Sequence, residues 1–292
     1  MRFIPLIALL GCVPLAAPAF GATGYVRPEL LAEPAELDEA QTTGLVILDA
    51  RDREQYEQAH IPGALWVDHD LWSESFDEQD AAAWSERIGS LGISAGSSVV
   101  VYDHRRMRDA ARIWWILRYW GVEHARVLNG GWKQWQEEQR PTGSQSPTVA
   151  PVAFDATPRE ERLATAAQVL RTLPGHAWQI VDARSDDEFC GIDPQENRRA
   201  GAIPGARNLE WSQLVDEDTH RIKSADELRR MFAEAGIDLQ RPSATHCQSG
   251  GRSSVMVLAM ELMGAGPVRN YYPGWSEWGN RDDTPVVVPD QD

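Results

Sequence analysis

The chain contains the same domain-sized pattern twice, and this duplication limits the folds that it can adopt. Three motifs occur in the same order in both halves of the sequence. The first copies are Asp49-Ala50-Arg51, His60-Ile61-Pro62-Gly63-Ala64 and Gly131-Trp132-Lys133-Gln134-Trp135, and the second copies are Asp182-Ala183-Arg184, Ala202-Ile203-Pro204-Gly205-Ala206 and Gly274-Trp275-Ser276-Glu277-Trp278. The offset grows from 133 residues (182 − 49) to 142 (204 − 62), which places a short insertion in the second copy at about residues 190–199. A repeat of this length is a tandem domain and not a solenoid unit.

Each copy alternates short apolar runs with a helical pattern. In the first copy, the apolar runs typical of buried parallel strands are residues 45–48, 98–102 and 125–128, and residues 109–120 have apolar side chains at helical spacing. The matching segments of the second copy are strands at 179–181, 243–246 and 268–271 and a helix at 253–263. The sequence therefore predicts an α/β fold class with two tandem domains, each a small parallel β-sheet flanked by helices.

The N-terminal segment and a polar linker set the predicted boundaries. Residues 1–22 combine an early positive charge, an apolar run and a small-residue end, which is typical of a secretory signal peptide and too short for a membrane span. We therefore predict an exported, periplasmic protein; alternatively, Leu9-Leu10-Gly11-Cys12 resembles a lipoprotein box that would leave the chain lipid-anchored through Cys12. The predicted domains are an N-terminal domain at 24–140 and a C-terminal domain at 161–292, joined by a linker at 141–160 that begins with Pro, Ser and Gly.

Charge and cysteine content exclude several classes of protein. The net charge of −16 argues against a nucleic-acid partner, because a phosphate backbone must be met by clustered Lys and Arg. After Cys12, only Cys190 and Cys247 remain, which is too few for a disulfide framework. Neither lies in a cluster with metal-ligand spacing, and no Gly-x-Gly-x-x-Gly follows a strand, so we expect no metal and no cofactor.

One loop has the residues that activate a nucleophile. Cys247 follows a predicted strand at its carboxyl end, where ligands bind open α/β sheets, and a helix follows the segment Gln248, Ser249, Gly250, Gly251, Arg252 and Ser253. The two glycines permit positive φ, so successive N–H groups can point inward, and the helix N-terminus adds positive potential. Such a loop lowers the pKa of a thiol and stabilises a thiolate or persulfide, while Arg252 offers a bidentate fork for an oxyanion.

Together these motifs resemble those of the tandem-domain rhodanese family, which includes thiosulfate and 3-mercaptopyruvate sulfurtransferases. The resemblance extends from about Val26 to Val288 and is carried by the repeated Ile-Pro-Gly-Ala segment, Asn129-Gly130-Gly131-Trp132, the loop from Cys247 to Ser253, and Gly274-Trp275-Ser276-Glu277-Trp278-Gly279. It implies that Cys247 is the catalytic nucleophile and that the residues after it cradle the substrate and the persulfide. In the first copy, Asp103 aligns with Cys247. A carboxylate cannot accept and pass on sulfane sulfur, so the N-terminal domain is predicted to be catalytically inactive.

The resemblance implies a two-step sulfur transfer. The Cys247 thiolate attacks the outer sulfur of thiosulfate, expels sulfite, and passes the resulting persulfide sulfur to cyanide or a thiol. The implied partners are thus a small anionic sulfur donor and a thiol or cyanide acceptor, and a protein acceptor stays open. We favour thiosulfate over 3-mercaptopyruvate, because members that use the latter resemble Cys-Gly-Ser-Gly-Val-Thr in the loop and carry a His-Met-Leu-Pro segment that residues 76–79 lack. Members that use thiosulfate often have a basic residue where this chain has Gln248, so the loop departs from both patterns.

Three arginines are candidates for contacting the donor. Some family members place a substrate-binding arginine at or near the position of Glu188. Arg198 and Arg199 of the insertion could substitute for it, and Arg184 is a further candidate. The pair formed by Asp182 and Arg184 would alternatively tie neighbouring loops together.

Two further features have alternative interpretations. Arg105, Arg106 and Arg108 are either solvated surface residues or a positive face that attracts an anionic donor to the interdomain cleft. Cys190 is either an inert thiol or a partner that forms a disulfide with Cys247 in an oxidising compartment.

Two other functions share some of these features. Cysteine phosphatases and arsenate reductases have a similar loop but place five residues between the cysteine and the arginine, whereas four separate Cys247 from Arg252. The shorter loop suits a sulfur atom better than a tetrahedral phosphate. A persulfide carrier that delivers sulfur to one partner protein without turnover would keep both residues, so it stays an alternative.

Overall fold

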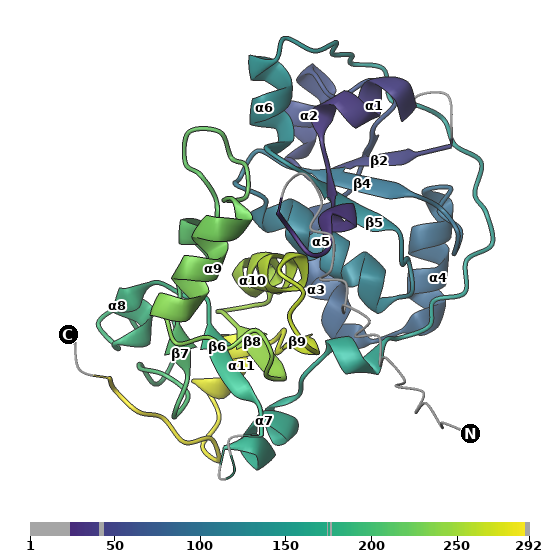
Figure 1. Ribbon diagram of the computed structural model, residues 1–292. Helices are drawn as coiled ribbons and strands as arrows, with labels where there is room; N and C mark the ends of the chain where they lie inside the picture. Colours follow the sequence, from purple (N-terminus) through teal and green to yellow (C-terminus); the bar gives the residue numbers. More distant parts are fainter. Residues whose placement is uncertain (1–23, 41–43, 174, 176, 290–292) are drawn as a thin grey trace, which may run out of the picture.

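The computed structural model of the chain describes residues 24–40, 44–173, 175 and 177–289. The predicted signal peptide and Cys12 lie outside the described residues. Two parallel β-sheets, one from each half of the chain, are each flanked by helices, as the sequence predicts (Figure 1). Among the described residues, no helix combines the length and the apolar character that crossing a membrane requires.

The N-terminal half forms a five-stranded sheet in the order β1-β5-β4-β2-β3. Its strands are β1 (Leu31–Ala32), β2 (Val46–Asp49), β3 (Leu65–Trp66), β4 (Val99–Tyr102) and β5 (Ala125–Leu128). Its helices are η1 (Pro28–Leu30), α1 (Pro34–Ala40), α2 (Arg53–Gln58), α3 (His69–Ser75), η2 (Phe76–Glu78), α4 (Ala81–Ser90), α5 (Arg108–Tyr119) and α6 (Gly131–Glu137), where η marks a 3₁₀ turn. The central strand β4 is buried along its whole length, which explains its continuous apolar sequence.

The C-terminal half forms a four-stranded sheet in the order β7-β6-β8-β9. Its strands are β6 (Gln179–Asp182), β7 (Arg207–Asn208), β8 (Ser243–His246) and β9 (Val268–Asn270). Its helices are η3 (Glu160–Arg162), α7 (Ala166–Thr172), α8 (Asp186–Phe189), η4 (Trp211–Leu214), α9 (Ala225–Glu234), α10 (Gly251–Leu262) and α11 (Gly274–Trp278). Asp49 pairs with Tyr102 in the first sheet and Asp182 pairs with His246 in the second, so the two sheets share one register.

The predicted strands and helices are confirmed to within about two residues. The helices expected at 109–120 and 253–263 are α5 at 108–119 and α10 at 251–262. Strands β1, β3 and β7 were not predicted, because each has only two residues and no periodicity that a pattern could detect.

Strand β8 is buried although its sequence is largely polar. The hydroxyl of Ser243 accepts a hydrogen bond from the Gln179 amide at 2.8 Å, and the hydroxyl of Thr245 donates to the carbonyl of Arg269 at 3.3 Å. Because these groups have partners, burying them carries no large desolvation cost. The strand that precedes Cys247 is thus fixed on both sides by its neighbours.

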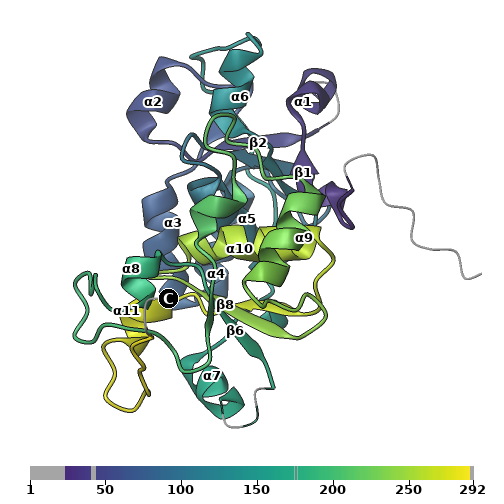
Figure 2. The same ribbon diagram turned by 60° about the vertical axis from the view of Figure 1, so that its left-hand side comes forward.

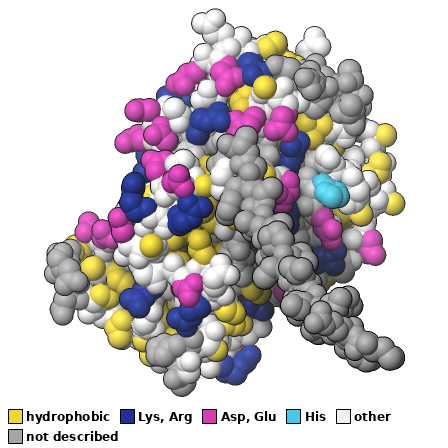
Figure 3. All heavy atoms as spheres, in the orientation of Figure 1, with side chains coloured by type: hydrophobic (Ala, Val, Ile, Leu, Met, Phe, Trp, Pro, Cys, Tyr) yellow, Lys and Arg dark blue, Asp and Glu magenta, His cyan; other side chains and the backbone are white. Residues whose placement is uncertain are grey.

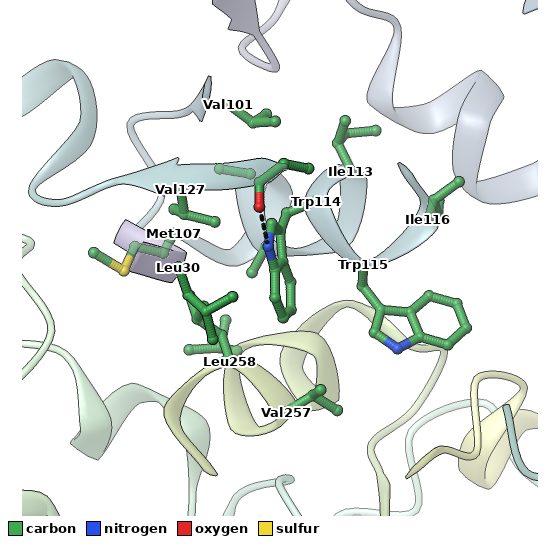
Figure 4. Close-up of a cluster of buried hydrophobic side chains, with 14 of the residues drawn as sticks. Leu30, Val101, Met107, Ile113, Trp114, Trp115, Ile116, Val127, Val257 and Leu258 are labelled. Atoms are coloured by element: carbon green, nitrogen blue, oxygen red, sulfur yellow. Dashed lines mark hydrogen bonds between the residues drawn. The ribbon is translucent and has the colours of Figure 1, made fainter. Parts of the chain in front are cut away.

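The two halves share one hydrophobic core. Helices α5 and α10 lie side by side between the sheets in both ribbon views (Figure 1, Figure 2). Trp114 and Trp115 of α5 lie near Val257 and Leu258 of α10, and the Trp114 indole donates to the carbonyl of Ala125 at 2.9 Å (Figure 4). Burying these large apolar side chains at the boundary holds the halves together, since each contributes on the order of 2 kcal/mol.

The segments that connect the halves pack on them. In the predicted linker, the N–H group of Val152 donates to the carbonyl of Gly89 at 3.0 Å and Phe154 is buried. At the start of the described chain, the N–H groups of Val26 and Arg27 donate to the carbonyl of Leu262 at 2.9 and 3.0 Å, so residues predicted to belong to the first domain lie against the second. On the face drawn in Figure 3, the coloured acidic and basic side chains are mixed and form no continuous basic surface.

Candidate active site

Cys247 lies at the carboxyl end of β8, at the start of the loop that leads into α10. It is 1% exposed. Gly250 has a φ of +85°, and a Cβ atom there would lie 2.4 Å from the Tyr272 ring, so only glycine fits. The expectation that both glycines supply positive φ is wrong for Gly251, which is the first residue of α10 and has no positive φ.

The loop stabilises the thiolate of Cys247. The hydroxyl of Ser253 donates to Cys247 Sγ at 3.5 Å. Burial by itself raises the pKa of Cys247, but the charge of Arg252, the Ser253 hydroxyl and the N–H groups of Ser253 and Ser249 together lower it below its ordinary value. A thiolate held in this way is the nucleophilic form of the side chain.

Arg252 is paired with a buried carboxylate. Its Nη1 donates to Glu188 Oε2 at 2.5 Å and its Nη2 donates to Glu188 Oε1 at 2.8 Å. Glu188 is 3% exposed and also forms a capping box with Ser185 at the start of α8. The bidentate fork that the sequence analysis assigned to a substrate oxyanion is therefore occupied by Glu188, and Arg252 acts on Cys247 through its charge.

The side chain of Gln248 joins the loop to the insertion of the second copy. Its amide makes a reciprocal pair of hydrogen bonds with the amide of Asn197, at 3.0 and 3.2 Å. Asn197 also accepts from the amide of Asn280 at 3.0 Å. The insertion thus lies directly beside the active-site loop and is tied to it through neutral groups.

The first half of the chain also contacts the loop, through Arg112 of α5. Arg112 donates to the carbonyl of Ser249 at 3.1 Å and to the hydroxyl of Ser73. Its guanidinium lies so close to Gly251 that a Cβ atom on that residue would be 2.5 Å from Nη2, so a side chain there would displace the guanidinium of Arg112. The hydroxyl of Tyr272 donates to Ser73 at 3.4 Å, so both halves of the chain meet beside the loop.

The first copy has an anion-binding loop at the equivalent place, and it is filled by its own side chain. Asp103 Oδ1 accepts from the N–H groups of Arg105 and Met107 at 2.9 and 3.1 Å, and Oδ2 accepts from those of Asp109 and Ala110 at 2.8 Å each. The loop is one residue longer than the second, since four positions separate Asp103 from the helix cap at 107 (107 − 103) and three separate 247 from the cap at 250 (250 − 247). These four bonds show within this chain that a loop of this design binds an anion.

Comparison with known proteins agrees with this geometry. The sequence profile of the Rhodanese-like domain matches residues 33–138 and 165–281. The chain belongs to the rhodanese family. Thiosulfate sulfurtransferase of Cricetulus griseus is 32% identical over 253 residues, which are 80% of this chain and 85% of that protein. The 3-mercaptopyruvate sulfurtransferase of Mus musculus is 32% identical over 235 residues, 77% of this chain and 79% of that protein. The chain is thus similar to two kinds of sulfurtransferase.

A solved rhodanese structure has the same two-domain architecture. It is that of Escherichia coli SseA, described as a 3-mercaptopyruvate sulfotransferase with the "Rhodanese" fold. The TM-score is 0.76 at 27% identity, and the match covers 84% of this chain and 98% of SseA. The resemblance inferred from the motifs is therefore confirmed over residues 33–138 and 165–281.

Arg184 lies within the second rhodanese domain and not at its surface. It is 1% exposed, donates to Asp182 at 3.0 and 2.6 Å and to the carbonyl of Gly201 at 2.8 Å, and stacks on Trp275. The first domain repeats the arrangement, with Arg51 on Asp49 at the same distances. A unit that occurs equally in a domain without the cysteine is best explained as structural.

Arg198 and Arg199 hold the insertion against the C-terminal segment. Arg198 donates to the carbonyl of Asn280 and to Asp282 at 3.1 and 3.0 Å. Arg199 donates to the carbonyls of Trp278, Gly279 and Thr284 at 2.6 to 3.2 Å. These bonds give no support to a contact with the donor, and they place both residues as anchors of the insertion that carries Asn197.

The remaining candidate residues lie outside the loop that follows Cys247. Arg105 and Arg108 pair with Asp109 at 3.6 and 3.0 Å, and Arg106 pairs with Glu217 at 3.7 Å. Cys190 is a half-buried free thiol, and burial together with Asp186 and Asp187 raises its pKa. Within the described residues, no group of three His, Cys, Asp or Glu side chains could hold a metal ion.

Three residues of the site were missed as such by the sequence analysis. Glu188 belongs to the helix-start pattern Ser185-x-x-Glu188, which predicts a capping box but not a contact with Arg252. Asn197 and Arg112 have no local signal, because their positions depend on how the insertion and the two halves pack.

Proposed function

We propose that this rhodanese transfers sulfane sulfur through a persulfide on Cys247, with thiosulfate as donor and cyanide or a thiol as acceptor. The observation that carries the proposal is that Cys247 is buried in a loop whose N–H groups and nearby arginine stabilise negative charge and lower its pKa. The same loop stabilises the persulfide, which carries the same charge one atom further out.

The two steps balance in atoms and charge. The Cys247 thiolate attacks the outer sulfur of thiosulfate, the S–S bond of thiosulfate breaks, and sulfite leaves with the electron pair. The acceptor, cyanide or a thiolate, then attacks the outer persulfide sulfur, which yields thiocyanate or a new persulfide and restores the Cys247 thiolate.

Leaving-group chemistry supports thiosulfate over 3-mercaptopyruvate. Sulfite leaves as a stable anion, whereas loss of sulfur from mercaptopyruvate forms an enolate that must be protonated. His246, which precedes the nucleophile, is fully buried, lies 3.4 Å from Asp182, and has its pKa lowered by burial, so it is poorly placed as a proton donor. Relatives of both kinds are similar to this chain, so the donor is the part of the proposal that needs a direct test.

Intact-protein mass spectrometry tests the proposal. Incubation with thiosulfate should add about 32 Da, one sulfur atom, and cyanide should remove it. Cys247→Ser should stay unmodified and Cys190→Ser should load like the wild type. An adduct from mercaptopyruvate but not from thiosulfate would identify mercaptopyruvate as the donor. The absence of an adduct from both compounds would refute the persulfide intermediate.

Turnover separates an enzyme from a carrier. Full loading with negligible transfer to cyanide or small thiols would favour a persulfide carrier for a partner protein. Hydrolysis of p-nitrophenyl phosphate would instead favour a phosphatase.

We also propose that the chain is exported to the periplasm. The support is the composition of residues 1–22 alone. Fractionation and N-terminal sequencing of the mature protein test this: a new N-terminus after Ala19, Gly21 or Ala22 supports a signal peptide, and a lipid-modified Cys12 supports the anchored form.

A further inference from the structure

Glu188 binds the guanidinium group of Arg252, the arginine whose charge stabilises the Cys247 thiolate. Both terminal nitrogens of Arg252 donate to the two oxygens of Glu188, at 2.5 and 2.8 Å. This is the arrangement in which an arginine binds a sulfonate, a sulfate or a carboxylate of a ligand. The chain therefore supplies, from α8, the anion that Arg252 would otherwise take from solution.

Glu188 is fixed in this position by its own helix. Its side chain is 4% exposed, whereas that of Arg252 is 22% exposed. Glu188 Oε2 also accepts from the N–H group and the hydroxyl of Ser185, at 3.3 and 3.1 Å. Burial raises the pKa of Glu188, but Arg252 and Ser185 together lower it below its ordinary value, so the carboxylate is ionised at neutral pH.

We propose that Glu188 is a specificity-determining residue that keeps the affinity of this active site for oxyanions low. An incoming oxyanion must bind without the fork of Arg252 or displace a buried carboxylate from it. The ligands affected are sulfonate-type anions, which include thiosulfate and the sulfite that it releases; this part of the inference rests on the proposed function. The same restraint favours release of the leaving anion after each transfer.

The pair also sets the charge of the loop. With Cys247 ionised, the charged groups at the loop are Arg252 and Arg112, which are positive, and Cys247 and Glu188, which are negative. Glu188 thus cancels one of the two positive charges that an anionic donor would otherwise meet, and this weakens the attraction for a dianionic donor more than for one with a single negative charge, such as a low-molecular-weight persulfide. Substitution of Glu188 by glutamine keeps the shape and removes one negative charge.

Protection of Cys247 from alkylation measures oxyanion binding without turnover. Methanesulfonate has the shape of thiosulfate with a methyl group in place of the transferable sulfur, and iodoacetamide is an uncharged reagent. We expect Glu188→Gln to be half-protected at a concentration about tenfold lower than the wild type, equivalent to about 1.4 kcal/mol of binding. The KM for thiosulfate should fall by a similar factor.

Asp187→Asn is the matched control. Asp187 is the adjacent residue of α8 and is exposed, so this variant makes the same change in net charge without touching Arg252. It should bind methanesulfonate as the wild type does. A Glu188→Gln protein with unchanged or weaker protection, or an equal gain in Asp187→Asn, would overturn the inference.

The outcomes also separate this inference from the proposed function. If thiosulfate adds no sulfur to Cys247 but Glu188→Gln gains protection by methanesulfonate, the donor assignment fails and the inference about Glu188 stands. If thiosulfate adds sulfur to Cys247 but Glu188→Gln gains no protection by methanesulfonate, the donor assignment stands and the inference about Glu188 fails. If Glu188→Gln does not fold, the wild-type protein provides the test. A methanesulfonate concentration for half-protection above about 1 mM supports the inference, and a concentration below about 1 mM refutes it.

Discussion

Arg252→Gln should destabilise the fold much more than Glu188→Gln, because the two partners differ in burial. Without Arg252, the Glu188 carboxylate stays buried, with a side chain only 4% exposed and no charged partner. Removing one partner of a buried pair in this way costs about 3–5 kcal/mol. Without Glu188, Arg252 is 22% exposed and can reach water, so the cost is about 1–2 kcal/mol. The double variant has no buried charge without a partner, so its free energy of unfolding should lie within about 2 kcal/mol of that of the starting protein.

Urea unfolding of the four proteins measures this cycle. The series is made in a Cys247→Ser background, so that oxidation of the thiol does not contribute. Free energies of unfolding are extrapolated to water and compared at equal m-values. The coupling energy between the two sites should be at least about 2 kcal/mol. An Arg252→Gln protein within about 1 kcal/mol of the reference, or single effects that simply add in the double variant, would refute the assignment of a buried pair.

The pH dependence of the same cycle has a defined sign. The pKa of Glu188 is lowered in the folded protein by Arg252 and Ser185, against the opposing effect of burial. The contribution of the pair to stability is therefore present above the ordinary glutamate pKa, about 4.3. It is lost as the pH falls through the lowered value in the fold. The coupling energy should vanish in acid and not in alkali.

Four further experiments test the loops and the contact between the halves. Gly250→Ala should cost about 2–4 kcal/mol in urea unfolding, because it combines a φ of +85° with a Cβ atom 2.4 Å from the ring of Tyr272. Asp103→Asn should lower the free energy of unfolding in urea by about 2 kcal/mol at pH 7.5, because an amide NH₂ would oppose two of the four N–H donors. The Asp103 carboxyl is ionised at that pH, since burial and Asp109 raise its pKa only to about 6. Alkylation of Cys247 by iodoacetamide should show a midpoint below that of a free cysteine, about 8.5, and a midpoint above it would contradict the stabilised thiolate. Arg112→Met should slow sulfur loading at least about tenfold while Arg112→Lys retains part of it, and loading rates equal to wild type in both would show that the contact with the loop is dispensable.

The parts of this protein that could be predicted are those encoded by neighbouring residues. The order of strands and helices follows from short apolar runs and one helical period in each copy, and the duplication supplies the same information twice. The anion-binding loop is likewise local, since Cys247, Gly250 and the start of α10 lie within five positions of one another. Backbone N–H groups at a helix start point inward whatever lies elsewhere in the chain.

The parts that could not be predicted depend on contacts between distant segments. Glu188 lies 64 positions from Arg252, and Arg112 lies 137 positions from Ser249. Their effects on the loop require α8 and α5 to be placed first, which depends on the packing of both halves. Gly251 shows the difference: its position suggested backbone freedom, whereas in the structure a guanidinium group from the other half packs against it.

The first rhodanese domain has Asp103 where the second has Cys247, and its geometry supports the loop of the second domain. Asp103 fixes the start of α5 through four backbone bonds, in the way that a bound anion would. Arg112, one turn further along the same helix, contacts the active-site loop of the second domain. A carboxylate at position 103 therefore has a structural consequence, because its hydrogen bonds order the start of the helix that carries Arg112. The duplicated loop has thus become an internal support for the loop that keeps Cys247.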